Sequence, residues 1–263
     1  MSARHGVGQV WKYDWAFTDM ETTSLIALSK QGVLRRQMDV IANNIANMNT
    51  TGFKGEKMMF VQYLVRNKSG DGIVGDKISY VRDIATMRDT SEGPLKKTGN
   101  PLDIAVRGEA YLTVQTAQGD RYTRNGHLRL DETGQLVTQA GNPILSDAGQ
   151  PFFFAPEDSG ITITRDGIVS TNNGDLGRLK IVEFANRQDL RQIGGGLLAT
   201  DKPPQTVTTP DVVQGMLEKS NVNAIAEMTK MIEVNRAYGA AKKFIDREDE
   251  RIKLMIKTVS EAI

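Results

Sequence analysis

The chain has 263 residues, of which 39% are hydrophobic and 25% are charged, and its formal net charge at pH 7 is +1. This composition is typical of a folded protein with one large or two small domains, and it gives no electrostatic reason to expect binding to nucleic acid or to an anionic membrane. The sequence contains no cysteine, which excludes disulfides, thiolate zinc sites and a thiol nucleophile. No window reaches the roughly 18 apolar residues of a membrane span, and the N-terminus lacks the apolar segment of a secretory signal.

The first predicted element is a helix over residues 22–48. Thr22, Thr23 and Ser24 offer N-caps, and Gly52 offers a stop. At about 1.5 Å per residue, the helix would be roughly 40 Å long. Its apolar residues step by four, three, four and three positions, which indicates a coiled-coil seam. These residues are Leu34, Met38, Ile41, Ile45 and Met48.

A polar stripe lies beside this seam. Asn43 and Asn44 lie four and three positions before Asn47, so we place all three on one face of the helix. Asn is unfavourable inside a helix, but its amide both donates and accepts hydrogen bonds, as a buried Asn does when it fixes the register of a coiled coil. We expect these three residues to contact neighbouring chains. The alternative is that the Asn and Thr residues simply end the helix, and we expect this for residues 49–52, which would form the exit turn.

The middle of the chain has a different period. Residues 68–100 are interpreted as an extended connector that contains a β-prone patch, KISYVRDIATMRD. From residue 101 to 211, strand-like runs such as YLTVQT and RLKIVEF alternate with turn formers such as AQGD and DETG. Short strands at about 8–12-residue spacing predict a compact antiparallel β-domain.

The C-terminal segment predicts a second helix. Few Gly and no Pro occur between Gln214 and Ile263, so a helix of up to roughly 60 Å could form. Its seam alternates steps of three and four with one polar interruption at Glu248, whereas Val222, Ile225 and Ile232 lie out of register and predict a shift or kink. The seam residues are Met231, Val234, Tyr238, Ala241, Ile245, Ile252, Met255 and Val259.

The predicted fold class is α+β, with long N- and C-terminal helices that pair into a coiled-coil-like domain, an inserted all-β domain and an extended connector. The expected domains are residues 20–67 with 212–263 for the helices, 68–100 for the connector and 101–211 for the antiparallel β-domain. A helix with one apolar seam is only marginally stable alone. We therefore expect the chain ends to be partly disordered in the monomer and to become ordered on assembly.

Few residues suggest chemistry. His5 and His127 are too few for a histidine metal site, and the glycines at 194–196 lack the motifs of a phosphate loop. We expect no metal, cofactor or catalytic residue. A rival class of function, a periplasmic enzyme or glycan-binding module, would need a carboxylate pair, but the candidate acids lie in or beside turns, where such residues are common. These acids are Asp103, Glu109 and Asp131.

Several long blocks resemble the family of bacterial flagellar rod and hook proteins. They include ALSKQGVLRRQMDVIANNIANMNTTGFK, RDTSEGPLKKTGNPLDIAVRGEAYLTVQT and EKSNVNAIAEMTKMIEVNRAYGAAKKFI. The resemblance runs in order from Met20 to about Asp246. Residues 1–19 precede it, so we expect them to be an extra segment that is disordered or that reflects a start codon assigned too early.

The resemblance implies a structural subunit of the flagellar basal-body rod, most similar to the proximal rod, that polymerises axially and transmits motor torque. It implies that both chain ends form the inner tube and that the β-domain lies outside. The implied partners are other rod subunits, the flagellar type III export apparatus and, as further candidates, the surrounding bushing rings, with no nucleic acid or small-molecule substrate. The implied location is the periplasmic rod, reached without a cleaved signal peptide. A distal rod or hook-type subunit is the alternative within the family.

Overall fold

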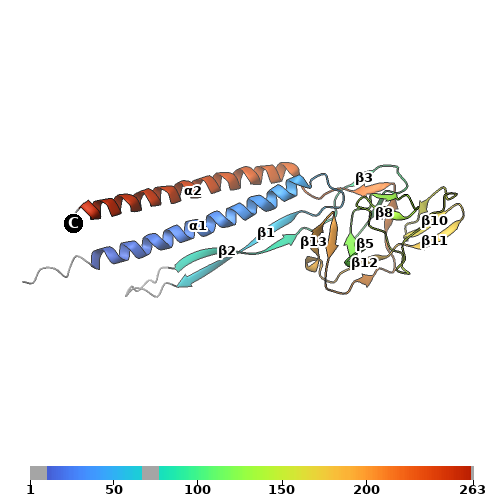
Figure 1. Ribbon diagram of the computed structural model, residues 1–263, viewed down its shortest axis with the longest axis horizontal. Coiled ribbons are helices and arrows are strands. Elements are labelled where there is room, and N and C mark those ends of the chain that lie inside the picture. The colour runs from blue at the N-terminus through green and yellow to red at the C-terminus, as the bar shows by residue number, and fades with distance from the viewer. Residues whose placement is uncertain (1–10, 67–76, 262–263) are drawn as a thin grey trace, which may run out of the picture. The chain divides into compact units, whose positions relative to one another are not determined.

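The computed structural model describes residues 11–66 and 77–261 and divides into two compact units (Figure 1). Unit 1 comprises Met1–Asn43, Lys57–Thr86 and Ile225–Ile263. Unit 2 comprises Asn44–Glu56 and Met87–Ala224. Each unit is therefore assembled from segments that are far apart in the sequence.

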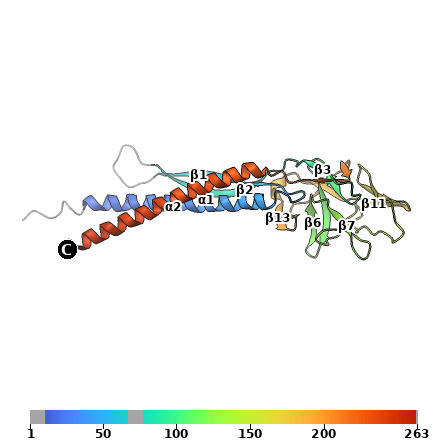
Figure 2. The same cartoon turned by 90° about the horizontal axis from the view of Figure 1, so that it is seen from above.

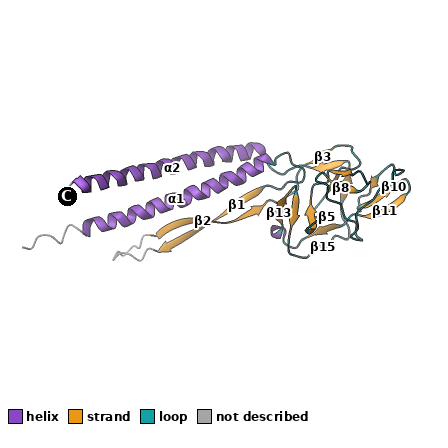
Figure 3. Cartoon of the chain, viewed as in Figure 1, coloured by secondary structure: helices purple, strands orange, loops and turns teal. Residues whose placement is uncertain are grey.

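Unit 1 contains nearly all of two long helices, α1 (Trp11–Ala46) and α2 (Ala224–Glu261), drawn in purple in Figure 3. With 36 and 38 residues, they are about 54 and 57 Å long at 1.5 Å per residue. The prediction that the first helix begins at residues 22–24 is wrong. Ser and Thr inside a helix cost only a fraction of a kcal/mol each, so a run of possible caps does not have to start one.

Part of the extra N-terminal segment, residues 1–19, therefore belongs to the first helix. Residues 11–19, which we expected to be disordered, form the beginning of α1. Residues 1–10 lie outside the described part of the chain.

The second helix begins at Ala224, later than the sequence indicated. Gly215 has a φ of +73°, a left-handed conformation that favours glycine and turns the chain. It separates two short strands, β16 (Val212–Gln214) and β17 (Met216–Glu218). Residues 212–223 therefore belong to the β-rich unit and not to the helix.

The middle part of the predicted extended connector instead forms one strand of a two-stranded ribbon. The strands β1 (Glu56–Arg66) and β2 (Lys77–Arg88) pair in a two-stranded sheet (Figures 1 and 3). Both strands are rich in the β-branched and aromatic residues that suit a pleated surface. The pairing partner of the KISYVRDIATMR strand is the preceding segment, which the sequence had led us to assign to the helical domain.

Unit 2 is built around a six-stranded sheet with the order β13-β14-β6-β5-β12-β15. Of its strands, Figure 1 labels β5, β12 and β13, and Figure 2 labels β6 and β13. The strand pairs of this unit are antiparallel, as predicted for the β-domain. The strands of this sheet are β5 (Tyr111–Thr116), β6 (Gly119–Thr123), β12 (Ile181–Glu183), β13 (Arg191–Gly194), β14 (Leu197–Ala199) and β15 (Gln205–Thr206).

Smaller sheets complete the unit, in the orders β11-β10-β9, β16-β4, β17-β3 and β7-β8. A short 3-10 helix, η1 (Arg187–Asp189), precedes β13. The remaining strands are β3 (Leu95–Lys97), β4 (Ile104–Val106), β7 (Leu128–Leu130), β8 (Leu136–Thr138), β9 (Thr162–Ile163), β10 (Ile168–Thr171) and β11 (Gly174–Arg178).

The turn formers in the sequence end strands as expected. In the DETG turn, the Asp131 carboxylate accepts hydrogen bonds from the backbone N–H groups of Thr133 and Gln135 at 2.9 and 2.8 Å. Such an Asx-type turn replaces the backbone hydrogen bonds that a strand end loses.

Unit 2 has its own hydrophobic core. Burying one Leu or Ile side chain stabilises a fold by about 1.5–3 kcal/mol. The many buried aliphatic residues of this core therefore stabilise the unit without a contribution from the helices. A second cluster packs Tyr122 edge-on against Phe184, with ring centroids 4.7 Å apart. The fully buried core residues include Ile104, Leu112, Val114, Leu136, Ile144, Val169, Leu179 and Ile181.

Candidate assembly interface

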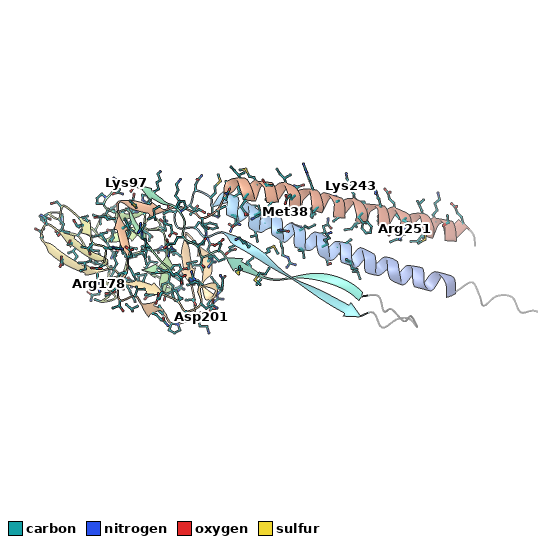
Figure 4. All side chains as sticks on the ribbon, turned by 180° about the vertical axis from the view of Figure 1, so that it is seen from behind. Met38, Lys97, Arg178, Asp201, Lys243 and Arg251 are labelled. Carbon is teal, nitrogen blue, oxygen red and sulfur yellow. The ribbon has the colours of Figure 1, made fainter. Side chains whose placement is uncertain are left out.

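The predicted seam of α2 is the least exposed face of that helix. Val234 is 7% exposed, and the other described seam residues are intermediate in exposure. Polar side chains elsewhere on the helix, such as Lys243 and Arg251, are exposed (Figure 4). The side chain of Val259 lies outside the described residues. The intermediate residues are Met231, Tyr238, Ala241, Ile245, Ile252 and Met255.

The seam of α1 is also partly covered. Ile41 is buried, while Leu34, Met38, Ile45 and Met48 are intermediate (Figure 4 labels Met38). The sequence pattern missed two further buried residues, Ala27 and Val33. The covered face is therefore wider than a single coiled-coil seam.

The two helices are not packed tightly along unit 1. A groove of about 430 Å³, open to solvent, is lined by residues of both helices, including Ile26, Ala27, Ala237 and Ala240. An open groove between two helices is not the continuous knobs-into-holes seam of a coiled coil. The small alanine side chains account for part of the groove.

A second set of apolar side chains on the helices is exposed. Ile225, Met228 and Ile232 lie three or four positions apart on α2, and Ile225 is 78% exposed. Ile225 and Ile232 are two of the three residues that the sequence placed out of register with the seam; the third, Val222, precedes α2. Leu25 and Leu28 are the exposed counterparts on α1. Single exposed apolar residues are normal, whereas contiguous exposed apolar patches are a common feature of interaction surfaces.

The asparagine stripe is divided between different roles. Asn44 is 3% exposed, and its amide makes two hydrogen bonds to the backbone of Glu56, donating to the carbonyl oxygen at 2.8 Å and accepting from the N–H at 2.9 Å. Asn43 is exposed, and the side-chain oxygen of Asn47 accepts from the Thr50 hydroxyl at 3.1 Å. Asn44 therefore closes the exit turn within its own chain, and it does not offer its amide to a neighbour as we expected.

The exit turn of α1 forms as the sequence predicted. The backbone N–H of Thr50 donates to the Asn47 carbonyl at 3.1 Å, and Gly52 has a φ of +69°. A Cβ at Gly52 would lie 2.7 Å from the carbonyl carbon of Arg124. Only glycine satisfies both the left-handed conformation and this close approach.

The α1-exit segment (residues 47–56) lies against the α2-entry segment (residues 216–223) inside unit 2. The N–H of Gly52 donates to the Glu218 carbonyl at 2.8 Å, and the N–H of Gly55 donates to the Asn221 side chain at 2.8 Å. The Asn221 amide in turn donates to the carbonyl oxygens of Asp89 and Ser91 at 2.9 and 3.1 Å. Three separate segments of the chain thus meet at one place.

A buried charge cluster lies at this meeting place and consists of Lys54, Arg124 and Glu218. One Glu218 carboxylate oxygen accepts from Lys54 Nζ at 2.5 Å and from the N–H of Gly93 at 2.9 Å, and the other accepts from Arg124 Nε at 2.7 Å. The side chains are 4%, 3% and 2% exposed for Lys54, Arg124 and Glu218. The sequence analysis did not single out any of these residues.

The remaining polar atoms of the cluster are also hydrogen-bonded. Arg124 donates to the carbonyl oxygens of Val106, Gly108 and Ala110, and Lys54 donates to that of Ser91. Buried charges are tolerated only when they are paired and hydrogen-bonded in this way.

The charges around Glu218 set its protonation. Burial by itself raises the pKa of this carboxyl, but the cations of Arg124 and Lys54 outweigh burial and hold the pKa below its ordinary value. Burial lowers the pKa of Lys54, Arg124 lowers it further, and Glu218 offsets part of this. Glu218 is therefore ionised at neutral pH.

A cavity of about 360 Å³ lies beside the cluster in unit 2 and is lined in part by the three consecutive glycines. These glycines form the turn between β13 and β14, with positive φ at each of residues 194–196. The cations that line the cavity, Lys54, Arg88 and Arg124, are already paired with Glu218 or Glu56. The cavity therefore does not have the free positive charge of a phosphate site.

The carboxylates considered as a catalytic pair have different partners. Asp103 contacts His127, with Oδ1 and Nδ1 2.6 Å apart, and Glu109 pairs with Arg187 at 2.7 Å. Asp131 shapes its own turn. Among the residues that the structure describes, no three His, Asp or Glu side chains are grouped to hold a metal ion. Neither described helix is long and apolar enough to span a membrane.

Comparison with known proteins covers most of the chain. Three family patterns match: "Flagella basal body rod protein" over residues 27–54, "Flagellar hook protein FlgE/F/G D1 domain" over 105–171, and "Flagellar basal body rod FlgEFG protein C-terminal" over 213–258. The first and last include much of α1 and α2, and the second lies within unit 2.

Whole relatives match as well. The chain is 39% identical over 234 residues to the flagellar basal-body rod protein FlgF of Caulobacter vibrioides, covering 88% of this chain and 95% of the relative. It is 35% identical over 222 residues to FlgF of Rhizobium meliloti, covering 83% and 90%. It is 33% identical over 252 residues to the flagellar basal-body rod protein FlgG of Buchnera aphidicola subsp. Schizaphis graminum, covering 86% and 95%.

Two long helices with apolar faces and a separate β-rich unit are features of a structural subunit that associates with other chains. The comparisons identify the family within this class. The chain belongs to the family of flagellar basal-body rod proteins.

Proposed function

We propose that this chain is a structural subunit of the proximal part of the flagellar basal-body rod, where it polymerises axially with other rod subunits and transmits torque. The observation that carries the proposal is the identity of 39% to a FlgF protein across 95% of that relative. The matches to FlgG proteins at 33% or less keep a distal rod position as the alternative.

The apolar helix faces support an assembly role. The seams leave several residues half-exposed, and Ile225, Met228 and Ile232 present further apolar area. Head-to-tail contacts that do not close generate a helical polymer. The proposed interface comprises Asn43 and Asn47 together with the α1 seam residues Leu34, Met38, Ile41, Ile45 and Met48 and the α2 seam residues Met231, Val234, Tyr238, Ala241, Ile245, Ile252, Met255 and Val259.

The helix faces are covered only in part in the single chain, and neighbouring subunits would complete their cover in the assembled rod. The loose packing along α1 and α2 in the single chain is consistent with this role of the neighbouring subunits. Export would use the flagellar type III apparatus without a cleaved signal peptide. The bushing rings around the rod would be further partners of unit 2.

Quantitative mass spectrometry of detergent-washed basal bodies tests the proposal. A few copies of this chain per particle, retained through washing and lost in a deletion strain, would support a short proximal segment. Copies in the tens would instead indicate a distal rod or hook-type subunit. No copies would contradict a rod function.

A further inference from the structure

The buried charge cluster contains more positive than negative charge. Two cations, Lys54 and Arg124, share the single carboxylate of Glu218, and each side chain is at most 4% exposed. Leaving a buried charge unpaired is strongly destabilising, whereas apolar groups of similar volume often stabilise a fold equally well. Stability alone therefore does not explain why these groups are buried here.

The three charged side chains come from three different segments of the chain. Lys54 belongs to the α1-exit segment and Glu218 to the α2-entry segment, while Arg124 follows β6 in the β-rich part of unit 2. Directional, charge-assisted hydrogen bonds specify a single arrangement more strongly than apolar contacts do. A buried polar group that fixes register is the best-attested use of this effect.

We propose that Glu218 is a positioning residue, which holds the α1-exit segment against the α2-entry segment so that both helices leave unit 2 from one fixed place before any neighbouring subunit binds. The importance of this for assembly rests on the proposed function. The intramolecular role does not.

The backbone contacts agree with this role. The main-chain carbonyl of Glu218 accepts from Gly52, and its carboxylate accepts from the N–H of Gly93. A Cβ at Gly93 would overlap the carbonyl oxygen of Lys219. Glu218 thus contacts the α1-exit segment through both its backbone and its side chain, and its carboxylate also contacts Gly93 and Arg124.

The excess of positive charge gives the proposal a distinctive test. In Glu218→Gln, two buried cations lose their common partner, while in Lys54→Met a balanced pair of Glu218 and Arg124 remains. In the double variant only the Arg124 cation is unpaired. Adding Lys54→Met to Glu218→Gln should therefore restore stability, although Lys54→Met alone lowers it.

Urea unfolding of the full-length chain measures this coupling. We expect the urea midpoint to fall in the order unchanged chain, Lys54→Met, double variant, Glu218→Gln. Losses that simply add, so that the double variant has the lowest midpoint, would overturn the proposal, because residues that act independently behave additively.

Native-state hydrogen exchange measures the positioning itself. In Glu218→Gln, the amides of Gly52, Gly55 and Glu56 should exchange at least tenfold faster, while the core amides of Leu136 and Leu145 keep their rates. Should Glu218→Gln not fold, Lys54→Met is used, with a smaller rise expected at the same three amides. Unchanged rates at these amides, or the same rise in both groups, would overturn the proposal.

Incorporation into basal bodies separates the proposal from the proposed function. Glu218→Gln should reduce incorporation, and the double variant should recover part of it. If the unchanged chain is itself missing from basal bodies, the proposed function fails, but the unfolding and exchange results still decide the role of Glu218. Full incorporation of Glu218→Gln despite faster exchange at Gly52 would overturn the assembly part.

Discussion

Lys54 and Glu218 are 164 residues apart in the sequence, yet their side chains meet at 2.5 Å in a place where neither is more than 4% exposed. This contact joins the segment that follows the first helix to the segment that precedes the second. The helices themselves carry the surfaces that we propose for assembly.

The charge cluster should lose its effect in acid. Because the pKa of Glu218 is held below its ordinary value, its contribution is fully present above the unfolded value of about 4.3 and is lost as the pH falls through the folded value. Urea unfolding from pH 7 to pH 3 should show the difference between the unchanged chain and Glu218→Gln shrinking as the pH falls, since a protonated carboxyl resembles the amide. A difference that stays constant over this range would contradict the prediction.

Asn44→Ala should destabilise unit 2. The substitution removes two hydrogen bonds to the Glu56 backbone at a side chain that is 3% exposed, which corresponds to about 1–3 kcal/mol. Asn43→Ala is the matched control, since the exposed position predicts a change within about 0.5 kcal/mol. Chemical denaturation compares the two variants, and equal losses would show that burial of Asn44 does not matter.

Gly52→Ala should be more harmful than an ordinary loop substitution. The residue has a φ of +69°, and a Cβ would approach the Arg124 backbone at 2.7 Å. Gly141→Ala is the control, because Gly141 has a φ of +82° but open space around it. The left-handed conformation alone costs about 1–2 kcal/mol, so thermal unfolding should show a loss of this size for Gly141→Ala and a larger one for Gly52→Ala. A similar decrease in Tm for both would refute the steric explanation.

Changes to the exposed stripe of α2 should impair assembly without affecting the fold. Ile225→Gln combined with Ile232→Gln alters two side chains that are 78% and 54% exposed, so the stability of the chain should change by no more than about 0.5 kcal/mol per site. Incorporation into basal bodies should fall because apolar contact area is lost. Circular dichroism checks the fold, and normal incorporation of the double variant would exclude this stripe from the interface.

The buried face of the helix supplies the contrasting case. Val234→Gln places a polar group at a side chain that is 7% exposed, so it should lower stability by about 1–3 kcal/mol as well as incorporation. The unfolding midpoint distinguishes the two stripes. A midpoint like that of the exposed double variant would mean that the seam is not covered in the free chain.

The sequence by itself determined the features that depend on near neighbours. The helical periodicity located the covered face of α2, and the Asn and Gly residues located the exit turn and the strand ends. These signals are readable because residues two to four positions apart share a face or a turn. The long sequence blocks also indicated the family, which the comparisons then established.

Only the tertiary structure decided features that depend on distant partners. The start of α1 at Trp11, the pairing of β1 with β2 and the burial of Asn44 all differed from expectation. The charge cluster gave no signal at all, because Lys, Arg and Glu are ordinarily surface residues. The folded chain brings Lys54, Arg124 and Glu218 together and buries them, and this contact between distant segments is what no local pattern in the sequence could indicate.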